Sequence, residues 1–148
     1  MTKVLFITSK REDYLQDSLL HGFRSLLGDS LIEYPLKHQM YDDFVGKENL
    51  YGRGFTLYGT LPASSKKSVD SINNQIHTYD LVVFSSIHRQ FEVFYEVMGE
   101  LSENKTILID GEDHPYLFPL FTKWRSDKRV RASLKTIRRY RFFKREQN

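Results

Sequence analysis

Three short apolar runs, each followed at once by polar residues, constrain the fold of this chain most strongly. They span residues 4–7, 81–84 and 106–109. Consecutive apolar residues are typical of parallel strands that are buried on both faces of a sheet. The segment 14–27, between the first two runs, carries apolar residues at helical spacing. Strands that alternate with helices predict a parallel α/β sheet with right-handed crossovers.

The whole pattern predicts one Rossmann-like or flavodoxin-like domain of three layers over residues 1–148. We expect a parallel sheet of four to five strands in the order 2-1-3-4, with the fifth, where it forms, beyond the fourth. Asp13 is expected to cap the first helix, and Gly28 is expected to end it. The expected strands are 3–9, 30–34, 80–86, 105–109 and 140–143, and the expected helices are 14–27, 66–78, 90–101 and 128–139.

Composition excludes several classes of protein. The chain has no cysteine, which excludes disulfides, thiolate catalysis and cysteine-based zinc or iron–sulfur sites. Hydrophobic residues make up 40% of the chain, which is enough to build a core and argues against disorder. The apolar run near the N-terminus has only four residues, too few for a signal peptide or a membrane span. These features predict a soluble, cytoplasmic protein.

Charge is distributed unevenly along the chain. Residues 123–145 hold 11 Lys and Arg and a single acid, Asp127, whereas residues 1–122 hold 11 bases and 17 acids. Aromatic residues interleave with these cations, a pattern that suits a nucleic-acid or other anionic partner. The alternative is a solvated helix that packs through Leu134 and Ile137 onto the acidic body. The alternative is preferred, because no recognised nucleic-acid module accompanies the charge.

Polar residues follow the first, third and fourth expected strands. The carboxyl ends of parallel strands share one edge of the sheet, where open α/β sheets bind ligands. Hydroxyls, cations, carboxylates and imidazoles at this edge would suit a polyhydroxylated or phosphorylated ligand, since arginine can clamp phosphate and carboxylates accept sugar hydroxyls. The alternative is that they are solvated loop residues and helix caps. The candidates are Ser9, Lys10, Arg11, Ser85, Ser86, His88, Arg89, Asp110, Glu112, Asp113 and His114.

Asp110 is expected to be the most sensitive polar residue of this edge, because the buried strand delivers it there directly. If Asp110 binds the ligand, Asp110→Asn should weaken binding while the fold survives; if it only caps the next turn, Asn should be tolerated. The long segment 36–62 contains four glycines, which permit sharp turns. We therefore also expect Arg53 to lie over the strand ends, near Asp110.

Metal and cofactor sites have little support in the sequence. Residues 110–114 are rich in carboxylates, which hard cations favour, but adjacent residues rarely all point inward. Gly52-Arg53-Gly54 does not follow the first strand and lacks the third glycine of a dinucleotide fingerprint. There is no phosphate-binding P-loop and no Gly-x-Ser-x-Gly elbow. We therefore predict no metal and no cofactor, and we assign no catalytic residue.

Several stretches together resemble a known family. The chain is similar to the N-terminal half of bacterial glycosyltransferase-like proteins of the spore-maturation type. The resemblance spans nearly the whole chain through motifs of moderate specificity. The stretches are Lys-Val-Leu-Phe-Ile-Thr-Ser at 3–9, Asp-Tyr-Leu-Gln-Asp at 13–17, Leu-Tyr-Gly-Arg-Gly-Phe-Thr-Leu-Tyr-Gly at 50–59, Ile-Asp-Gly-Glu-Asp at 109–113, and Phe-Phe-Lys-Arg-Glu at 142–146.

The resemblance implies a GT-B architecture, in which two Rossmann-like domains face each other across a cleft. The N-terminal domain of such enzymes mostly holds the acceptor, and the C-terminal domain holds the nucleotide-sugar. We therefore expect this chain to bind a sugar, glycan or other polar acceptor and to be inactive without a nucleotide-sugar-binding domain in cis or in trans. Either it is a fragment of a longer protein, or it is a free-standing domain that needs a partner.

Overall fold

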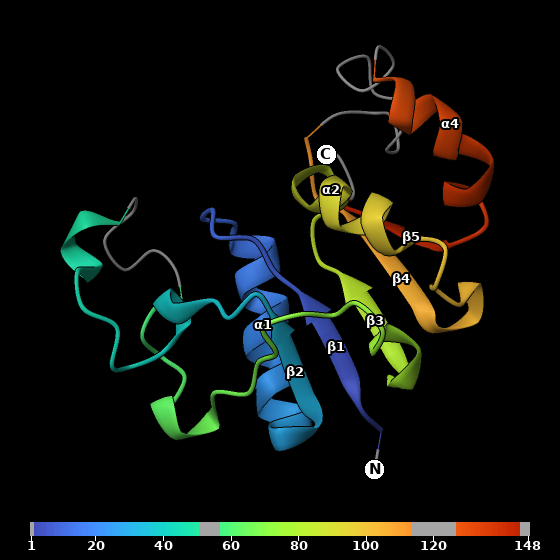
Figure 1. Cartoon of the computed structure of the whole chain (residues 1–148). Coiled ribbons are helices and arrows are strands. Elements are labelled where there is room, and N and C mark those ends of the chain that lie inside the picture. Colours follow the sequence, from blue (N-terminus) through green and yellow to red (C-terminus); the bar gives the residue numbers. More distant parts are fainter. Residues whose placement is uncertain (1, 51–56, 114–126, 146–148) are drawn as a thin grey trace.

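The computed structural model describes residues 2–50, 57–113 and 127–145, which form a five-stranded parallel sheet with helices on both faces (Figure 1). The sheet order is β2-β1-β3-β4-β5, so the predicted order and the fifth strand are both confirmed. The strands are β1 (Val4–Ile7), β2 (Leu31–Tyr34), β3 (Leu81–Phe84), β4 (Thr106–Asp110) and β5 (Arg141–Lys144). The α-helices are α1 (Tyr14–Leu27), α2 (Ile87–Val97) and α4 (Lys128–Ile137).

Alternating side chains of the central strands build two separate cores, one on each face of the sheet. In β1, Val4 and Phe6 pack on the face that α1 covers, whereas Leu5 and Ile7 pack on the face that α2 and α4 cover. All four residues are at most 1% exposed. Burial on both faces explains why these strands are continuous apolar runs rather than alternating ones. The result is a three-layer domain.

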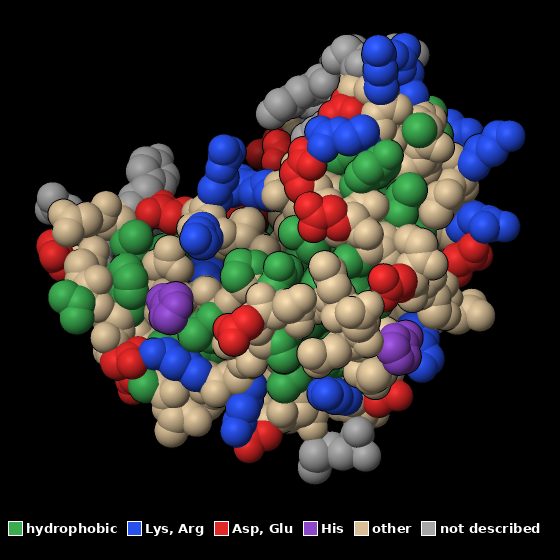
Figure 2. Space-filling view, viewed as in Figure 1, with side chains coloured by type: hydrophobic (Ala, Val, Ile, Leu, Met, Phe, Trp, Pro, Cys, Tyr) green, Lys and Arg blue, Asp and Glu red, His purple; other side chains and the backbone are tan. Residues whose placement is uncertain are grey.

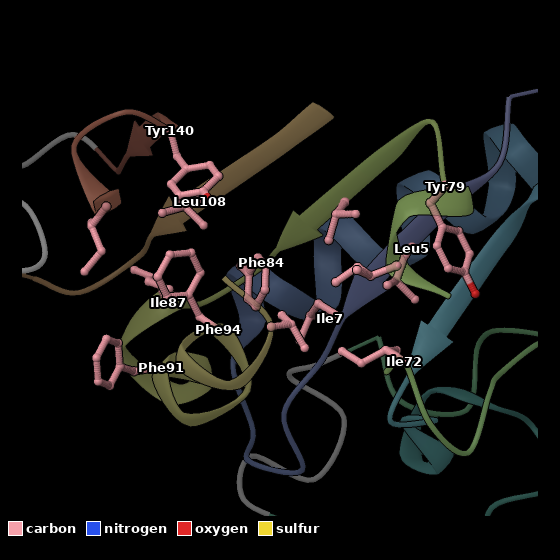
Figure 3. Close-up of a cluster of buried hydrophobic side chains, with 14 of the residues drawn as sticks. Leu5, Ile7, Ile72, Tyr79, Phe84, Ile87, Phe91, Phe94, Leu108 and Tyr140 are labelled. Atoms are coloured by element: carbon pink, nitrogen blue, oxygen red, sulfur yellow. The ribbon is translucent and has the colours of Figure 1, made fainter. Parts of the chain in front are cut away.

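The core beneath α2 and α4 is rich in aromatic side chains (Figure 3). Phe94 of α2 makes edge-to-face contacts with Phe84 at 5.4 Å and with Tyr140 at 5.5 Å between ring centroids. Such geometry is favoured by the ring quadrupoles and adds to the hydrophobic burial. The Tyr140 hydroxyl donates a hydrogen bond to the carbonyl of Met98 at 3.3 Å. Tyr140 therefore ties the segment between α4 and β5 to the end of α2.

Both predicted ends of α1 are confirmed. The Asp13 side chain accepts a hydrogen bond from the Gln16 amide at 3.1 Å, which makes Asp13 the N-cap. Gly28 ends the helix with a φ of 52° and a ψ of −125°, a conformation that is strained for residues with a Cβ atom.

Gly28→Ala should therefore lower the free energy of unfolding by about 1 kcal/mol or somewhat more, through backbone strain alone. No atom lies within 4 Å of the place where the new Cβ would be, so no clash contributes. Gly99→Ala is the matched control, because Gly99 is equally open but has no positive φ. Urea unfolding of the two variants should separate them, and equal stabilities would argue against strain at Gly28.

The predicted helix over 66–78 is wrong. The segment forms no α-helix: Ser68 forms a β-bridge with Glu33 of β2, residues 73–75 form a turn, and Ile76–Thr78 form a short 3₁₀ helix. Its many Ser, Asp and Asn residues compete with helix formation by bonding to nearby backbone, and Asn74 adopts a positive φ of 65°. Ile72 and Ile76 are nonetheless buried in the core, as expected. The prediction that these apolar residues face the core is thus confirmed, but their spacing does not reflect a helix.

A second correction concerns the start of α2. The helix begins at Ile87, not at Gln90, so His88 and Arg89 belong to its first turn rather than to the preceding loop. Among the helices in the described ranges, none is both long enough and apolar enough to cross a membrane.

Candidate functional site

A cleft of about 660 Å³ opens at the carboxyl edge of the sheet. It lies where the ends of β1 and β2, the start of α2 and the turn after β4 come together. Figure 2 shows Lys and Arg side chains around the hollow at the upper edge of this view. The lining residues are Thr8, Ser9, Lys10, Arg11, Pro35, His88, Arg89, Gln90, Val93 and Glu112.

Six of the residues predicted from the strand ends line this cleft, namely Ser9, Lys10, Arg11, His88, Arg89 and Glu112. Four others, Ser85, Ser86, Asp110 and Asp113, do not line it. Arg53 and His114 lie outside the described residues, and so does the expected contact between Arg53 and Asp110. The sequence therefore located the cleft, but it did not separate the residues that face it from those that support it.

Ser85 belongs to a buried polar network beneath the cleft. Its hydroxyl donates to the Ile7 carbonyl at 2.7 Å and lies 2.9 Å from Gln16 Oε1. Gln90 donates to the same carbonyl and to Gln16 Oε1, at 2.9 and 3.1 Å, and its own Oε1 accepts from the Ser86 amide at 3.0 Å. Gln16 also holds the backbone of Ser9 by two hydrogen bonds. The network thus fixes the loops after β1 and β3 relative to each other.

Gln16 and Gln90 are residues that the sequence analysis missed. Both are at most 2% exposed. Gln90 immediately precedes Phe91 and lies four positions before Phe94, so its place on the inward side of the helix was visible in the spacing. A polar residue at an inward position must find hydrogen-bond partners, and that requirement was the available signal.

Asp110 is completely buried at the end of β4. Its Oδ1 lies 3.0 Å from His88 Nε2 and accepts hydrogen bonds from Lys144 Nζ at 3.1 Å and from the Glu112 amide at 3.3 Å. Lys144 also donates to the Glu112 carbonyl. The carboxylate therefore holds His88 against the cleft and ties β5 to the turn after β4. Ser85 and the Ser86 amide are engaged with the two glutamines instead.

Arg89 bridges two loops across the rim of the cleft. Its guanidinium donates to the Glu12 carbonyl at 2.9 Å and lies 3.4 Å from the Asp13 carboxylate and 4.0 Å from that of Glu112. Lys10 and Arg11 are exposed on the same rim, and no ion pair involves their side chains within the part of the chain that the structure describes. The rim therefore presents cationic donors that are available to a ligand.

A buried ion pair supports the loop that carries Lys10 and Arg11. Lys37 Nζ pairs with the Asp17 carboxylate and donates to the Arg11 carbonyl at 2.9 Å. Both side chains are at most 1% exposed. Burial raises the pKa of Asp17 and lowers the pKa of Lys37, while each charge opposes the shift of the other. This pair was not predicted, because Lys37 belongs to the segment 36–62, whose structure the sequence left open.

A second buried pair joins α1 to β2. Arg24 of α1 donates to Glu33 at 2.6 Å, to the Leu31 carbonyl at 2.7 Å and to the Gly28 carbonyl at 2.9 Å. The Tyr41 hydroxyl also donates to Glu33. Burial, followed by the charge of Glu33, raises the pKa of Tyr41. These bonds fasten α1, β2 and the segment after β2 to one another.

The described residues contain no group of three or more His, Asp or Glu side chains that could hold a metal ion. The side chains that line the cleft offer hydroxyl, guanidinium, ammonium and carboxylate groups, which suit hydrogen bonding and charge recognition. Searches with protein-family models, among curated proteins and among solved structures gave no match to this chain.

Proposed function

We propose that this chain is a glycosyltransferase-like N-terminal domain that binds a sugar or another polar acceptor in the carboxyl-edge cleft. The observation that carries the proposal is the cleft itself, which gathers polar side chains from several loops above a hydrogen-bonded polar layer. Preorganised polar groups in a concave site are what recognition of a polyhydroxylated ligand requires. The resemblance of residues 3–9, 13–17 and 109–113 to glycosyltransferase-like proteins supports the same class of ligand.

Each lining group has a distinct chemical use in this proposal. Arg11 and Lys10 supply cationic donors to a phosphate or to ring and exocyclic oxygens of the acceptor. Glu112 supplies an acceptor for ligand hydroxyls on the opposite side of the cleft. A nucleotide-sugar-binding domain, in cis or in trans, supplies the donor sugar, so the chain alone binds its acceptor without transferring a sugar to it.

Arg11→Gln should weaken binding of a sugar phosphate by tenfold or more, because a charge-assisted hydrogen bond contributes about 1.5–3 kcal/mol. The measurement is isothermal titration of a panel of neutral sugars and sugar phosphates. Arg141→Gln is the matched control, because Arg141 is also exposed but lies on β5, outside the cleft. A panel in which no sugar or sugar phosphate binds, or equal binding by both variants, would overturn the proposal.

A further inference from the structure

Helix α4 and its C-cap residue carry a line of four exposed cations. They lie at intervals of three, four and three residues, which places them on one face of an α-helix. At a rise of about 1.5 Å per residue, the line extends over about 15 Å. We refer to it as the cationic stripe, and it consists of Lys128, Arg131, Lys135 and Arg138.

The cationic stripe is not neutralised by the protein within the described residues, where none of its four members forms an ion pair. The flanking arginines differ, because Arg129 pairs with Glu92 and Asp127, and Arg139 pairs with Glu103 at 3.1 Å. The helix itself, Lys128–Ile137, contains no acidic residue. The acids near α4 are therefore used by the flanking arginines, and the stripe remains available to an external anion.

The opposite face of α4 fixes the direction in which the stripe points. Val130, Ser133 and Ile137 are buried, and Val130 and Ile137 belong to the core beneath α2 and α4. The exposed large hydrophobic residues of the described chain are Tyr14, Leu26, Val45 and Phe143, and none of them belongs to α4. The helix thus presents charge without an apolar surface that could enter a lipid bilayer, which interfacial helices need.

We propose that the cationic stripe binds the phosphate backbone of a nucleic acid. A linear row of unpaired cations complements a linear polyanion, and such contacts gain free energy from release of condensed counterions. The contacts are with phosphates and carry no sequence information, so binding is independent of base sequence. This site is separate from the carboxyl-edge cleft and does not depend on the function proposed for the cleft.

The test is fluorescence anisotropy with a short labelled single-stranded oligonucleotide of mixed sequence, titrated at several salt concentrations. The triple variant Arg131→Gln, Lys135→Gln, Arg138→Gln should bind at least tenfold more weakly at low salt. Its plot of log affinity against log salt should also be shallower by about 2, since each lost phosphate contact removes about 0.7 from the slope. Substitution of exposed side chains should leave the circular dichroism spectrum unchanged.

The matched control replaces Lys3, Lys67 and Lys105 with Gln, three exposed lysines outside α4. It changes the net charge by the same amount, so it should retain the affinity and the salt slope of the parent chain. Equal weakening by both triple variants would show that only the overall charge matters and would overturn the proposal. Binding to vesicles of anionic phospholipid with no binding to the oligonucleotide would also overturn it, in favour of a membrane surface. Absence of binding to either probe would overturn it as well.

Discussion

Replacing Lys37 with Met should lower the free energy of unfolding by about 3–5 kcal/mol, because it leaves the buried Asp17 carboxylate without its countercharge. Lys37 is 1% exposed and also donates to the Arg11 carbonyl, so the variant deprives that carbonyl of this hydrogen bond as well. Methionine nearly preserves the volume of the lysine chain, and cavity formation contributes little. Urea unfolding measured by circular dichroism gives the change directly.

The double variant Lys37→Met, Asp17→Asn distinguishes a stranded charge from a simple packing defect. Removal of the charge at position 17 should restore a large part of the lost stability, whereas a packing defect should make the losses add.

Lower pH should likewise restore stability to the single variant Lys37→Met, because protonation removes the charge of Asp17. Burial raises the pKa of Asp17 above its ordinary 3.8, and loss of Lys37 removes the charge and the hydrogen bond that oppose this rise. The deficit of Lys37→Met should therefore shrink as the pH falls through this raised pKa, and a deficit independent of pH would contradict the explanation.

Arg24→Met is the second substitution with a large expected effect, again about 3–5 kcal/mol. Arg24 is 3% exposed, and its guanidinium donates hydrogen bonds to Glu33 and to the Leu31 and Gly28 carbonyls. Without it, Glu33 is a buried carboxylate whose remaining donors are the Tyr41 hydroxyl and the Lys37 amide. One neutral hydroxyl and one amide do not replace a cation.

Arg131→Met is the matched control for this second prediction, because it makes the same chemical change on an exposed face of α4. Exposed substitutions of this kind usually alter stability by less than about 0.5 kcal/mol. Denaturant midpoints of the two variants should therefore differ clearly. Similar midpoints would mean that the bonds of Arg24 are fully offset by the desolvation of its charge, which is the known weakness of buried ion pairs as a source of stability.

The sheet could be predicted from the sequence because its signal is redundant. The runs at 4–7, 81–84 and 106–109 are too short for helices and too apolar for a solvated sheet face, and right-handed crossovers restrict their order. The cleft followed from the same logic, since parallel strands must end together. The helix prediction for 66–78 was wrong because the apolar spacing of three and four residues fits both a helix and a non-helical chain that crosses a core.

The support beneath the cleft could not be predicted for a different reason. Asp17 and Lys37 are 20 residues apart, and each looks like an ordinary surface residue in its own stretch of sequence. Their burial depends on how the segment after β2 returns to α1, which is a property of tertiary packing. Asp110 shows the same limit, since the sequence placed it at the correct edge but did not show that Lys144 would reach it from β5.

The order of the strands has a consequence for how the chain folds while it is being synthesised. In the finished sheet β1 pairs with β2 and β3, β4 pairs with β3, and β5 pairs with β4. We therefore expect β1 and β2 to pair first as the chain emerges, and the later strands to add in chain order. After the first pair, the sheet therefore grows in one direction, and every strand leaves the ribosome when its neighbour is already in place. No strand has to enter between two that are already paired. The pairing of β1 with β3 joins the two neighbouring strands that lie farthest apart in the sequence. It closes the loop that contains α1, β2 and the long segment after β2. We expect this closure to set the folding rate.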